Sequence, residues 1–179
     1  MELDRSLRFL SRYEDATHVD PCIGSATIQR SELKGVHPDV VRVVERAIEI
    51  TEQDFTVFDG IRSAADQRVL YNRGASQRDG YSRKSQHQKQ ESGYGEAVDL
   101  VPWINGEPVW DWDAIYLIAD AVVTAARELD VPLRWGGCWQ PVNDLSGSPE
   151  NWVAAYVKRK RAAGKRAFND GPHWELCPK

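Results

Sequence analysis

Two histidines and one aspartate supply the side chains of a metal site. His87 lies in the phrase SQH, Asp99 in GEAVDL and His173 in DGPHWEL. Two imidazoles and one carboxylate are a common ligand set for zinc, and three protein ligands leave the fourth tetrahedral position to water. Because an open position distinguishes a catalytic zinc from a structural one, these residues predict a metallohydrolase.

The setting of Asp99 strengthens this prediction. Its neighbours on both sides are apolar, in the run AVDLV. A carboxylate in such a run is costly to bury unless it is paired or binds a metal. His18 and His37 lie in no comparable phrase, and we expect them to be structural or capping residues.

The composition fits a single soluble domain. The chain has 179 residues, 41% of them apolar and 28% charged, and contains seven Trp, enough to bury a core. A net charge of −4 and no base-reading motif argue against a nucleic-acid partner. No secretory signal or membrane-spanning run is apparent, so we expect a cytoplasmic protein. Cys22, Cys138 and Cys177 show no CxxC spacing, and we expect free thiols.

Hydrophobic spacing and turn residues predict an α+β fold. The predicted helices begin at His37-Pro38-Asp39, run from Ser63 to near Gly74, and cover 113–129 and 148–164; the predicted strands are 54–59, 97–102, 133–135 and 172–176. Asn105-Gly106 is a turn signal. The strongest helix, 113–129, should bury Ile115, Ile118, Ala119, Val122, Val123 and Ala126.

A basic run and the tryptophans each allow two interpretations. Lys158 to Arg161, with Lys165 and Arg166, would suit an anionic envelope polymer or a membrane surface. Such a run is more often the solvated face of a helix, here one that packs Trp152, Ala155 and Tyr156 inward. Six tryptophans are candidates for stacking on sugar rings but are more simply explained as core or cleft walls: Trp103, Trp110, Trp112, Trp135, Trp139 and Trp174.

Five phrases in fixed order carry a family resemblance: GIRS at 60–63, SQH at 85–87, GEAVDLVP at 95–102, RWGG at 134–137 and DGPHWEL at 170–176. The order resembles zinc peptidases of the D-alanyl-D-alanine carboxypeptidase (VanY-like) group, most closely phage endolysins that cut the L-alanyl-D-glutamate bond of peptidoglycan. The resemblance covers about residues 32–176. It implies the LAS fold shared with the hedgehog domain, a small antiparallel sheet flanked by helices and carrying Zn²⁺.

One spacing departs from the family pattern. The family places its first His seven residues before the Asp, whereas His87 precedes Asp99 by twelve. Ser92 occupies the ungapped position, but Ser is a poor zinc ligand and the SQH phrase is intact. We therefore interpret 88–92 as an insertion within a long polar loop, 75–93, which is either an ordered lid or a mobile segment.

The resemblance also implies roles for residues around the metal. Asp170, three residues before His173, matches the acid/base that takes a proton from water and passes it to the leaving amine. Glu175 competes for this role because residues two apart on a strand share a face. We favour Asp170 as the acid/base and expect Glu175 to orient an imidazole.

Three further residues are candidates for binding or support. Arg62 is expected to bind a substrate carboxylate or the developing oxyanion bidentately, and Gln67, one turn into the following helix, to support it. Ser85 either forms a hydrogen bond near the metal or shapes its loop.

These inferences predict a monomeric zinc peptidase that acts on the peptidoglycan stem peptide as an endolysin. We expect one catalytic domain over 1–179 without a separate cell-wall-binding domain, and a holin partner that releases the enzyme from the host cytoplasm to the periplasm and wall. A D-alanyl-D-alanine carboxypeptidase is an alternative with the same metal centre. A non-catalytic zinc-containing wall-binding or interaction module is the alternative of another class, and the presence of Asp170 argues against it.

Overall fold

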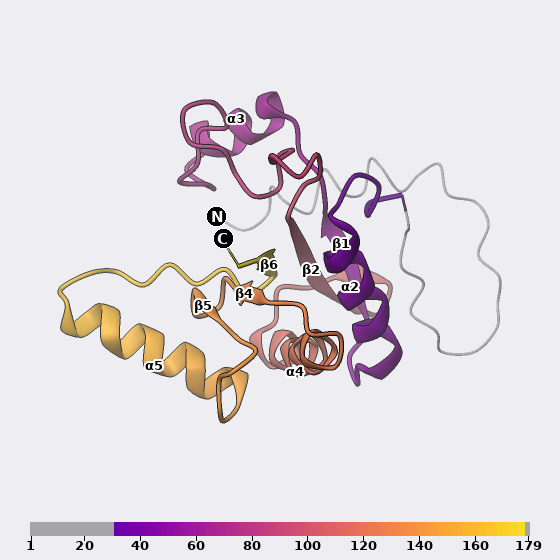
Figure 1. Ribbon diagram of the computed structural model, residues 1–179. Coiled ribbons are helices and arrows are strands. Elements are labelled where there is room, and N and C mark those ends of the chain that lie inside the picture. The colour runs from indigo at the N-terminus through magenta and orange to yellow at the C-terminus, as the bar shows by residue number, and fades with distance from the viewer. Residues whose placement is uncertain (1–30, 178–179) are drawn as a thin grey trace.

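The computed structural model describes residues 31–177 (Figure 1). The elements are α2 (Pro38–Ile50), β1 (Phe55–Asp59), α3 (Ala64–Asn72), β2 (Ala97–Ile104), β3 (Glu107–Pro108), α4 (Trp112–Glu128), β4 (Leu133–Trp135), β5 (Gln140–Pro141), α5 (Pro149–Ala162) and β6 (His173–Leu176). The predicted α+β fold with a small antiparallel sheet is confirmed. The start of the chain, with His18 and Cys22, lies outside the described residues.

The sheet places the ends of distant segments side by side. Its strand order is β1-β2-β6-β4-β5, with β3 paired to β2, and the pairings are antiparallel. In this register Asp99 of β2 is aligned with Asp59 of β1 on one side and with His173 of β6 on the other. Two residues 74 positions apart in sequence are thereby adjacent.

One face of this sheet packs on α2 and α4 to form the core. Val98 and Leu100 of β2 and Trp174 of β6 belong to that core. Because side chains alternate across a strand, Asp99 and His173 project from the opposite face. The apolar run around Asp99 is therefore explained: its neighbours fill the core while its carboxylate faces away from it.

The helices follow the predicted spacing with one exception. All six residues expected to point inward from α4 are buried, and the His37 side chain accepts the Asp39 backbone N–H at the start of α2 as an N-cap. On α5, Ala155 was predicted to be buried but is exposed. The buried face is instead centred on Trp152, Val153 and Tyr156.

The sheet also contains a tight turn and two strands of only two residues each. Asn105 and Gly106 have φ values of 53° and 85°, as a tight hairpin turn between β2 and β3 requires. The two-residue strands β3 and β5 were not predicted, because each contains a Pro, which disfavours strand assignment.

Cys138 and Cys177 are free thiols as expected. None of the described helices is long and apolar enough to cross a bilayer.

Candidate metal centre

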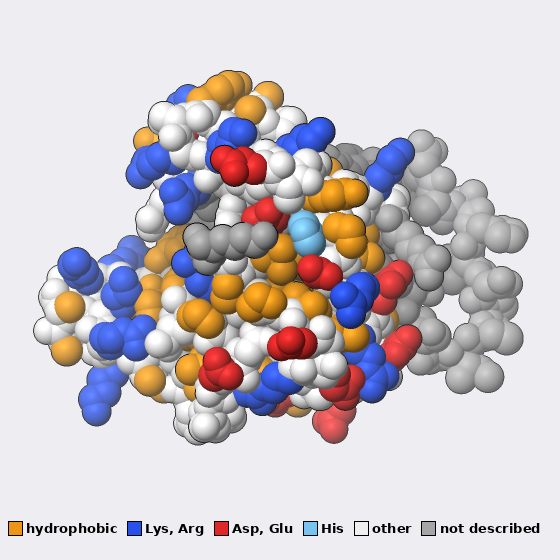
Figure 2. Space-filling view, in the orientation of Figure 1, with side chains coloured by type: hydrophobic (Ala, Val, Ile, Leu, Met, Phe, Trp, Pro, Cys, Tyr) orange, Lys and Arg blue, Asp and Glu red, His pale blue; other side chains and the backbone are white. Residues whose placement is uncertain are grey.

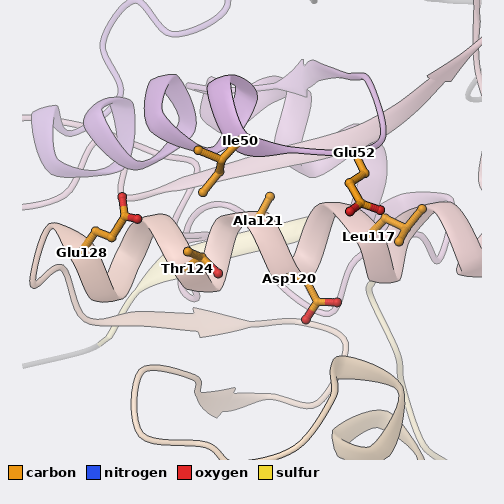
Figure 3. Close-up of a pocket in the computed structure, with 7 residues that line it drawn as sticks. All are labelled: Ile50, Glu52, Leu117, Asp120, Ala121, Thr124 and Glu128. Atoms are coloured by element: carbon orange, nitrogen blue, oxygen red, sulfur yellow. The ribbon is translucent and has the colours of Figure 1, made fainter.

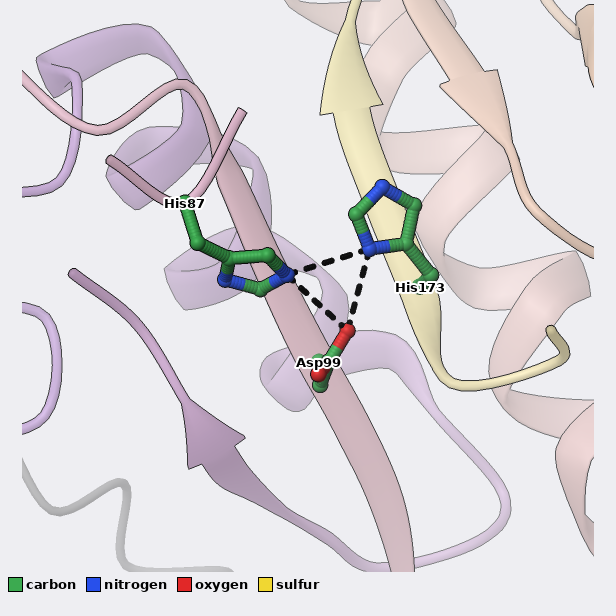
Figure 4. Close-up of side chains that lie close together, drawn as sticks. All are labelled: His87, Asp99 and His173. Carbon is green, nitrogen blue, oxygen red and sulfur yellow. Dashed lines mark hydrogen bonds and ion pairs between the residues drawn. The ribbon is translucent and has the colours of Figure 1, made fainter. Parts of the chain in front are cut away.

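Three side chains from separate segments converge on one point (Figure 4). His87 Nε2, His173 Nδ1 and Asp99 Oδ1 lie 3.1–3.2 Å from one another. Both histidines are buried, at 2% and 7% exposure. Between residues 31 and 177 this is the one group of His, Cys, Asp or Glu close enough to share a metal ion.

The outer nitrogen of each imidazole is held by an acceptor. His87 Nδ1 lies 2.8 Å from the Gly60 carbonyl oxygen, and His173 Nε2 lies 3.0 Å from Glu175 Oε2. A carbonyl or carboxylate oxygen only accepts, so these nitrogens carry the ring protons and the inner nitrogens present lone pairs. Two lone pairs and a carboxylate oxygen aimed at one point are the donor set of a zinc site, and the residues fit that metal.

Charge at this point also favours a cation. Burial opposes ionisation of Asp99, but the His87 and His173 imidazoles outweigh it and hold the pKa of the carboxyl well below its usual value. Burial likewise opposes a charge on His173, yet hydrogen bonds to Asp99 and Glu175 raise its pKa to about 10. Asp99 and Glu175 are therefore anionic, and their negative charge favours a positive charge here, either on the His173 ring itself or on a metal ion bound in place of its proton.

His87 is positioned by its loop rather than by a strand. Its backbone carbonyl accepts the Arg62 N–H at 2.8 Å, and its own N–H lies 3.3 Å from the Ser85 Oγ. The observed contact of Ser85 thus shapes the loop. Ser92 is exposed and donates to the Glu96 carboxylate, so His87 and not Ser92 reaches the metal group.

The extra residues of this loop form the tip of a small hairpin. Lys89 pairs with Gly95 in an antiparallel bridge, and the Gln90 N–H donates to the Tyr94 carbonyl at 2.8 Å. Gln88 is buried and its side chain binds the Ser85 N–H and the Gly80 carbonyl. Gln88 therefore belongs to the framework of the loop, and residues 91–94 form its exposed tip. The assignment of 88–92 as an insertion stays a prediction.

Arg62 is fixed beside the metal group by neighbours on both sides. Nε and Nη2 donate to Asp59 Oδ2 at 3.1 and 2.7 Å, and Nη1 donates to Gln67 Oε1 at 2.8 Å. Nη2 also lies 3.5 Å from the outer oxygen of Asp99. Burial lowers the pKa of Arg62, but the Asp59 and Asp99 carboxylates outweigh it and the pKa is raised. Gln67 is fully buried and anchors the 75–93 loop through Ser76.

Glu175 is engaged inside the protein by two partners. It is 3% exposed; Oε2 binds His173, and Oε1 accepts from Arg134 of the neighbouring strand. Burial raises the pKa of its carboxyl, yet His173 and Arg134 outweigh this and the pKa is lowered. This placement suits orientation of the imidazole. Arg134 and Asp59 were not among the residues predicted from the sequence. Each is aligned across the sheet with a predicted site residue, Arg134 with Glu175 and Asp59 with Asp99, and this alignment is the signal that could have identified them.

Asp170 lies in the turn that leads into β6. Its N–H donates to the Gly136 carbonyl at 3.0 Å, and its carbonyl accepts the His173 N–H at 3.2 Å. Its negative charge contributes to the raised pKa of both Arg62 and His173. The carboxylate is therefore near the metal group, on the side where Arg62 also lies.

Comparison with known proteins shows the family to which the chain belongs. The family model described as phage L-alanyl-D-glutamate peptidase matches residues 25–177. The chain belongs to this family. It is 34% identical over 146 residues to the L-alanyl-D-glutamate peptidase of Escherichia phage T5, covering 81% of this chain and 91% of that one. The crystal structure of the Serratia marcescens L-Ala D-Glu endopeptidase ChiX is similar, with 31% identity, a TM-score of 0.60, and 85% and 91% of the two chains covered.

The group of His87, Asp99 and His173 is separate from a pocket between α2 and α4 (Figure 3). That pocket is lined by Glu52, Asp120 and Glu128 among others and contains none of the predicted site residues. Burial and the charge of Glu52 raise the pKa of Asp120, while Arg46 pairs with Glu128. The lining of this pocket includes carboxylates but no histidine, so it lacks the ligand set found at His87, Asp99 and His173.

Proposed function

We propose that this protein is a zinc-dependent endopeptidase that hydrolyses the L-alanyl-D-glutamate bond of bacterial peptidoglycan. The observation that carries the proposal is the group of His87, Asp99 and His173, with both outer imidazole nitrogens anchored, in a member of the phage L-alanyl-D-glutamate peptidase family. When bound there, zinc polarises a carbonyl and lowers the pKa of water toward neutrality.

We infer roles for the surrounding residues from their positions and from the family resemblance. Asp170 takes a proton from the attacking water on its carboxylate and returns it to the leaving amine. Glu175, with both oxygens occupied by His173 and Arg134, keeps the ring proton on His173 Nε2 and so presents Nδ1. Arg62, held by Asp59 and Gln67, offers a fixed cation to a free carboxylate of the stem peptide or to the developing oxyanion.

Digestion of purified peptidoglycan by the zinc-loaded protein tests the proposal. Mass spectrometry should find new amino-terminal D-glutamate on intact glycan strands, and Asp170→Asn should abolish it. Asp144→Asn, at an exposed aspartate, is the matched control and should remain active. Loss of terminal D-alanine alone would indicate the D-alanyl-D-alanine carboxypeptidase. No products from folded, metal-loaded protein would indicate a binding module.

The biological setting is part of the same proposal. We infer an endolysin that is monomeric, stays in the host cytoplasm until a holin releases it, and then reaches the periplasm and wall. A single catalytic domain over 1–179 with no separate wall-binding domain stays a prediction. Sedimentation analysis tests the oligomeric state, and expression with and without a holin tests the route: lysis without a holin would contradict it.

A further inference from the structure

One surface of the molecule carries a concentrated positive charge. It lies on the second half of α5 and the segment after it, where Figure 2 shows Lys and Arg side chains gathered. We call it the α5 basic surface, and it consists of Lys158, Arg159, Lys160, Arg161, Lys165 and Arg166. No acidic residue occurs from 151 to 169. Since the whole chain has a net charge of −4, the positive charge belongs to this surface and not to the protein generally.

The cations of this surface have no ionic partners within the described part of the chain. Other arginines, such as Arg46 and Arg62, are paired with carboxylates. On the α5 basic surface, Arg159 and Lys160 lie over the ring of Tyr156 at 5.6 and 5.4 Å, and the remaining four have no side-chain bond to residues 31–177. Within residues 31–177, no carboxylate occupies these charges.

The fold alone does not account for this arrangement. Trp152, Val153 and Tyr156 bury the inner face of α5, so its packing does not depend on the cations. A positive last turn stabilises a helix through its dipole, which explains charge up to Arg161. Lys165 and Arg166 lie beyond the last helical residue, Ala162, so they are not part of that last turn, yet they extend the same positive surface.

An aromatic strip connects the α5 basic surface to the metal group. Phe168 follows Arg166 by two residues and is 41% exposed. Its ring lies 6.2 Å from the ring of Trp139, which lies 5.5 Å from the ring of His173. Trp139 Nε1 also donates to the Phe168 carbonyl at 2.7 Å. A polymer bound on the basic surface would therefore lie next to the centre that cuts it.

We propose that the α5 basic surface holds the enzyme on the polyanionic peptidoglycan sacculus, through the free carboxylates of stem peptides neighbouring the one being cut. This inference rests on the proposed function. A sacculus presents carboxylates repeatedly along each strand, so several weak ion pairs act together and raise the local concentration of substrate. A single soluble stem peptide cannot engage the surface in this way.

The test compares two variants that lose equal charge. The first is Arg161→Gln/Lys165→Gln/Arg166→Gln, which avoids the cations that stack on Tyr156. The control is Lys34→Gln/Arg78→Gln/Lys84→Gln, at exposed cations that form no side-chain bond with the described residues. Binding is measured by cosedimentation with purified sacculi in an Asp170→Asn background, which prevents digestion. Turnover is measured without that substitution, on sacculi and on a soluble stem-peptide fragment.

We expect the first variant to bind sacculi on the order of 100-fold more weakly, given roughly fivefold for each cation near an anionic surface. Its KM on sacculi should rise while its kcat/KM on the soluble fragment stays within about twofold, and raised salt should weaken binding by the wild type more than binding by the variant, which keeps three of the six cations. Equal binding by both variants would overturn the proposal. So would loss of binding to anionic phospholipid vesicles with binding to sacculi retained. Failure of the wild type to cut the soluble fragment would instead refute the proposed function.

Discussion

Replacement of Gly136 by Ala tests whether the turn that carries Asp170 and His173 must be held in place. A Cβ at Gly136 would lie 2.5 Å from the Asp170 carbonyl oxygen and 3.0 Å from the His173 Cβ. The backbone of Gly136 is not left-handed, so alanine meets no conformational strain there. The effect of the substitution is purely steric, and it acts on the two residues whose positions matter most to the proposed chemistry.

The size of the displacement sets the expected loss. To restore an ordinary contact, the Asp170 carbonyl must retreat by about 0.5–0.9 Å, and a misplacement of about 1 Å near reacting groups costs about 100-fold in rate. The hydrogen bonds from the Gly136 N–H to the His173 carbonyl and from the Asp170 N–H to the Gly136 carbonyl transmit the movement to both residues. We therefore expect kcat/KM on a soluble stem-peptide fragment to fall about 100-fold, equivalent to about 2.7 kcal/mol.

The assay pairs that rate with zinc affinity, measured by competition with a chromophoric chelator, and with the melting temperature. Gly164→Ala is the control: Gly164 has a φ of +65°, and a Cβ added there would have nothing within 4 Å. Alanine there should cost about 1 kcal/mol of stability through its left-handed backbone and leave kcat/KM intact. Equal kcat/KM for Gly136→Ala and Gly164→Ala would refute the claim that the turn is rigid and required.

Three substitutions test the roles of individual residues. Asp170→Asn should lower kcat by about 10²–10⁴-fold, as loss of an acid/base does, while zinc affinity is kept; unchanged kcat would exclude it from that role. Glu175→Gln removes the anionic acceptor of His173 and Arg134 and should weaken zinc binding about 10–100-fold in the chelator competition. Arg62→Lys keeps a charge but loses the forked contacts, so KM for the soluble fragment should rise about tenfold or more. A KM equal to the wild type would show that charge alone suffices.

Two of the three proposed ligands, Asp99 and His173, could be placed from the sequence because side chains alternate between the two faces of a strand. Val98 and Leu100 had to be buried, so Asp99 between them had to project from the other face. The same holds for His173 beside Trp174. The alternation of side chains depends only on neighbouring residues along one strand, so the local sequence pattern predicts which face each residue occupies.

Partners across the sheet could not be predicted in this way. Arg134 reaches Glu175 because β4 and β6 align these two residues. Asp59 reaches Asp99 only through a register shift between Val57 and Asp59. Register depends on how whole strands pack, and a slip of one residue would turn each of these side chains to the opposite face.

The spacing of twelve residues between His87 and Asp99 has a structural explanation in the hairpin. Lys89 and Gly95 are paired across an antiparallel bridge, so their Cα atoms are about 4.5–5.5 Å apart. Residues 91–94 are exposed. Deletion of 90–94 would join the two paired residues directly and restore the spacing of seven that the family resemblance implies.

We expect this deletion to preserve the metal group. Consecutive Cα atoms are about 3.8 Å apart, so the junction between Lys89 and Gly95 needs a movement of only about 1–2 Å. The deletion also removes two hydrogen bonds that a tip side chain donates to the loop backbone, which should lower stability by about 1–3 kcal/mol. The melting temperature should fall while zinc affinity remains within about threefold of the wild type, a range far smaller than the loss of a ligand would cause. If zinc binding is lost although the protein stays folded, the tip itself positions His87 and the insertion is part of the site.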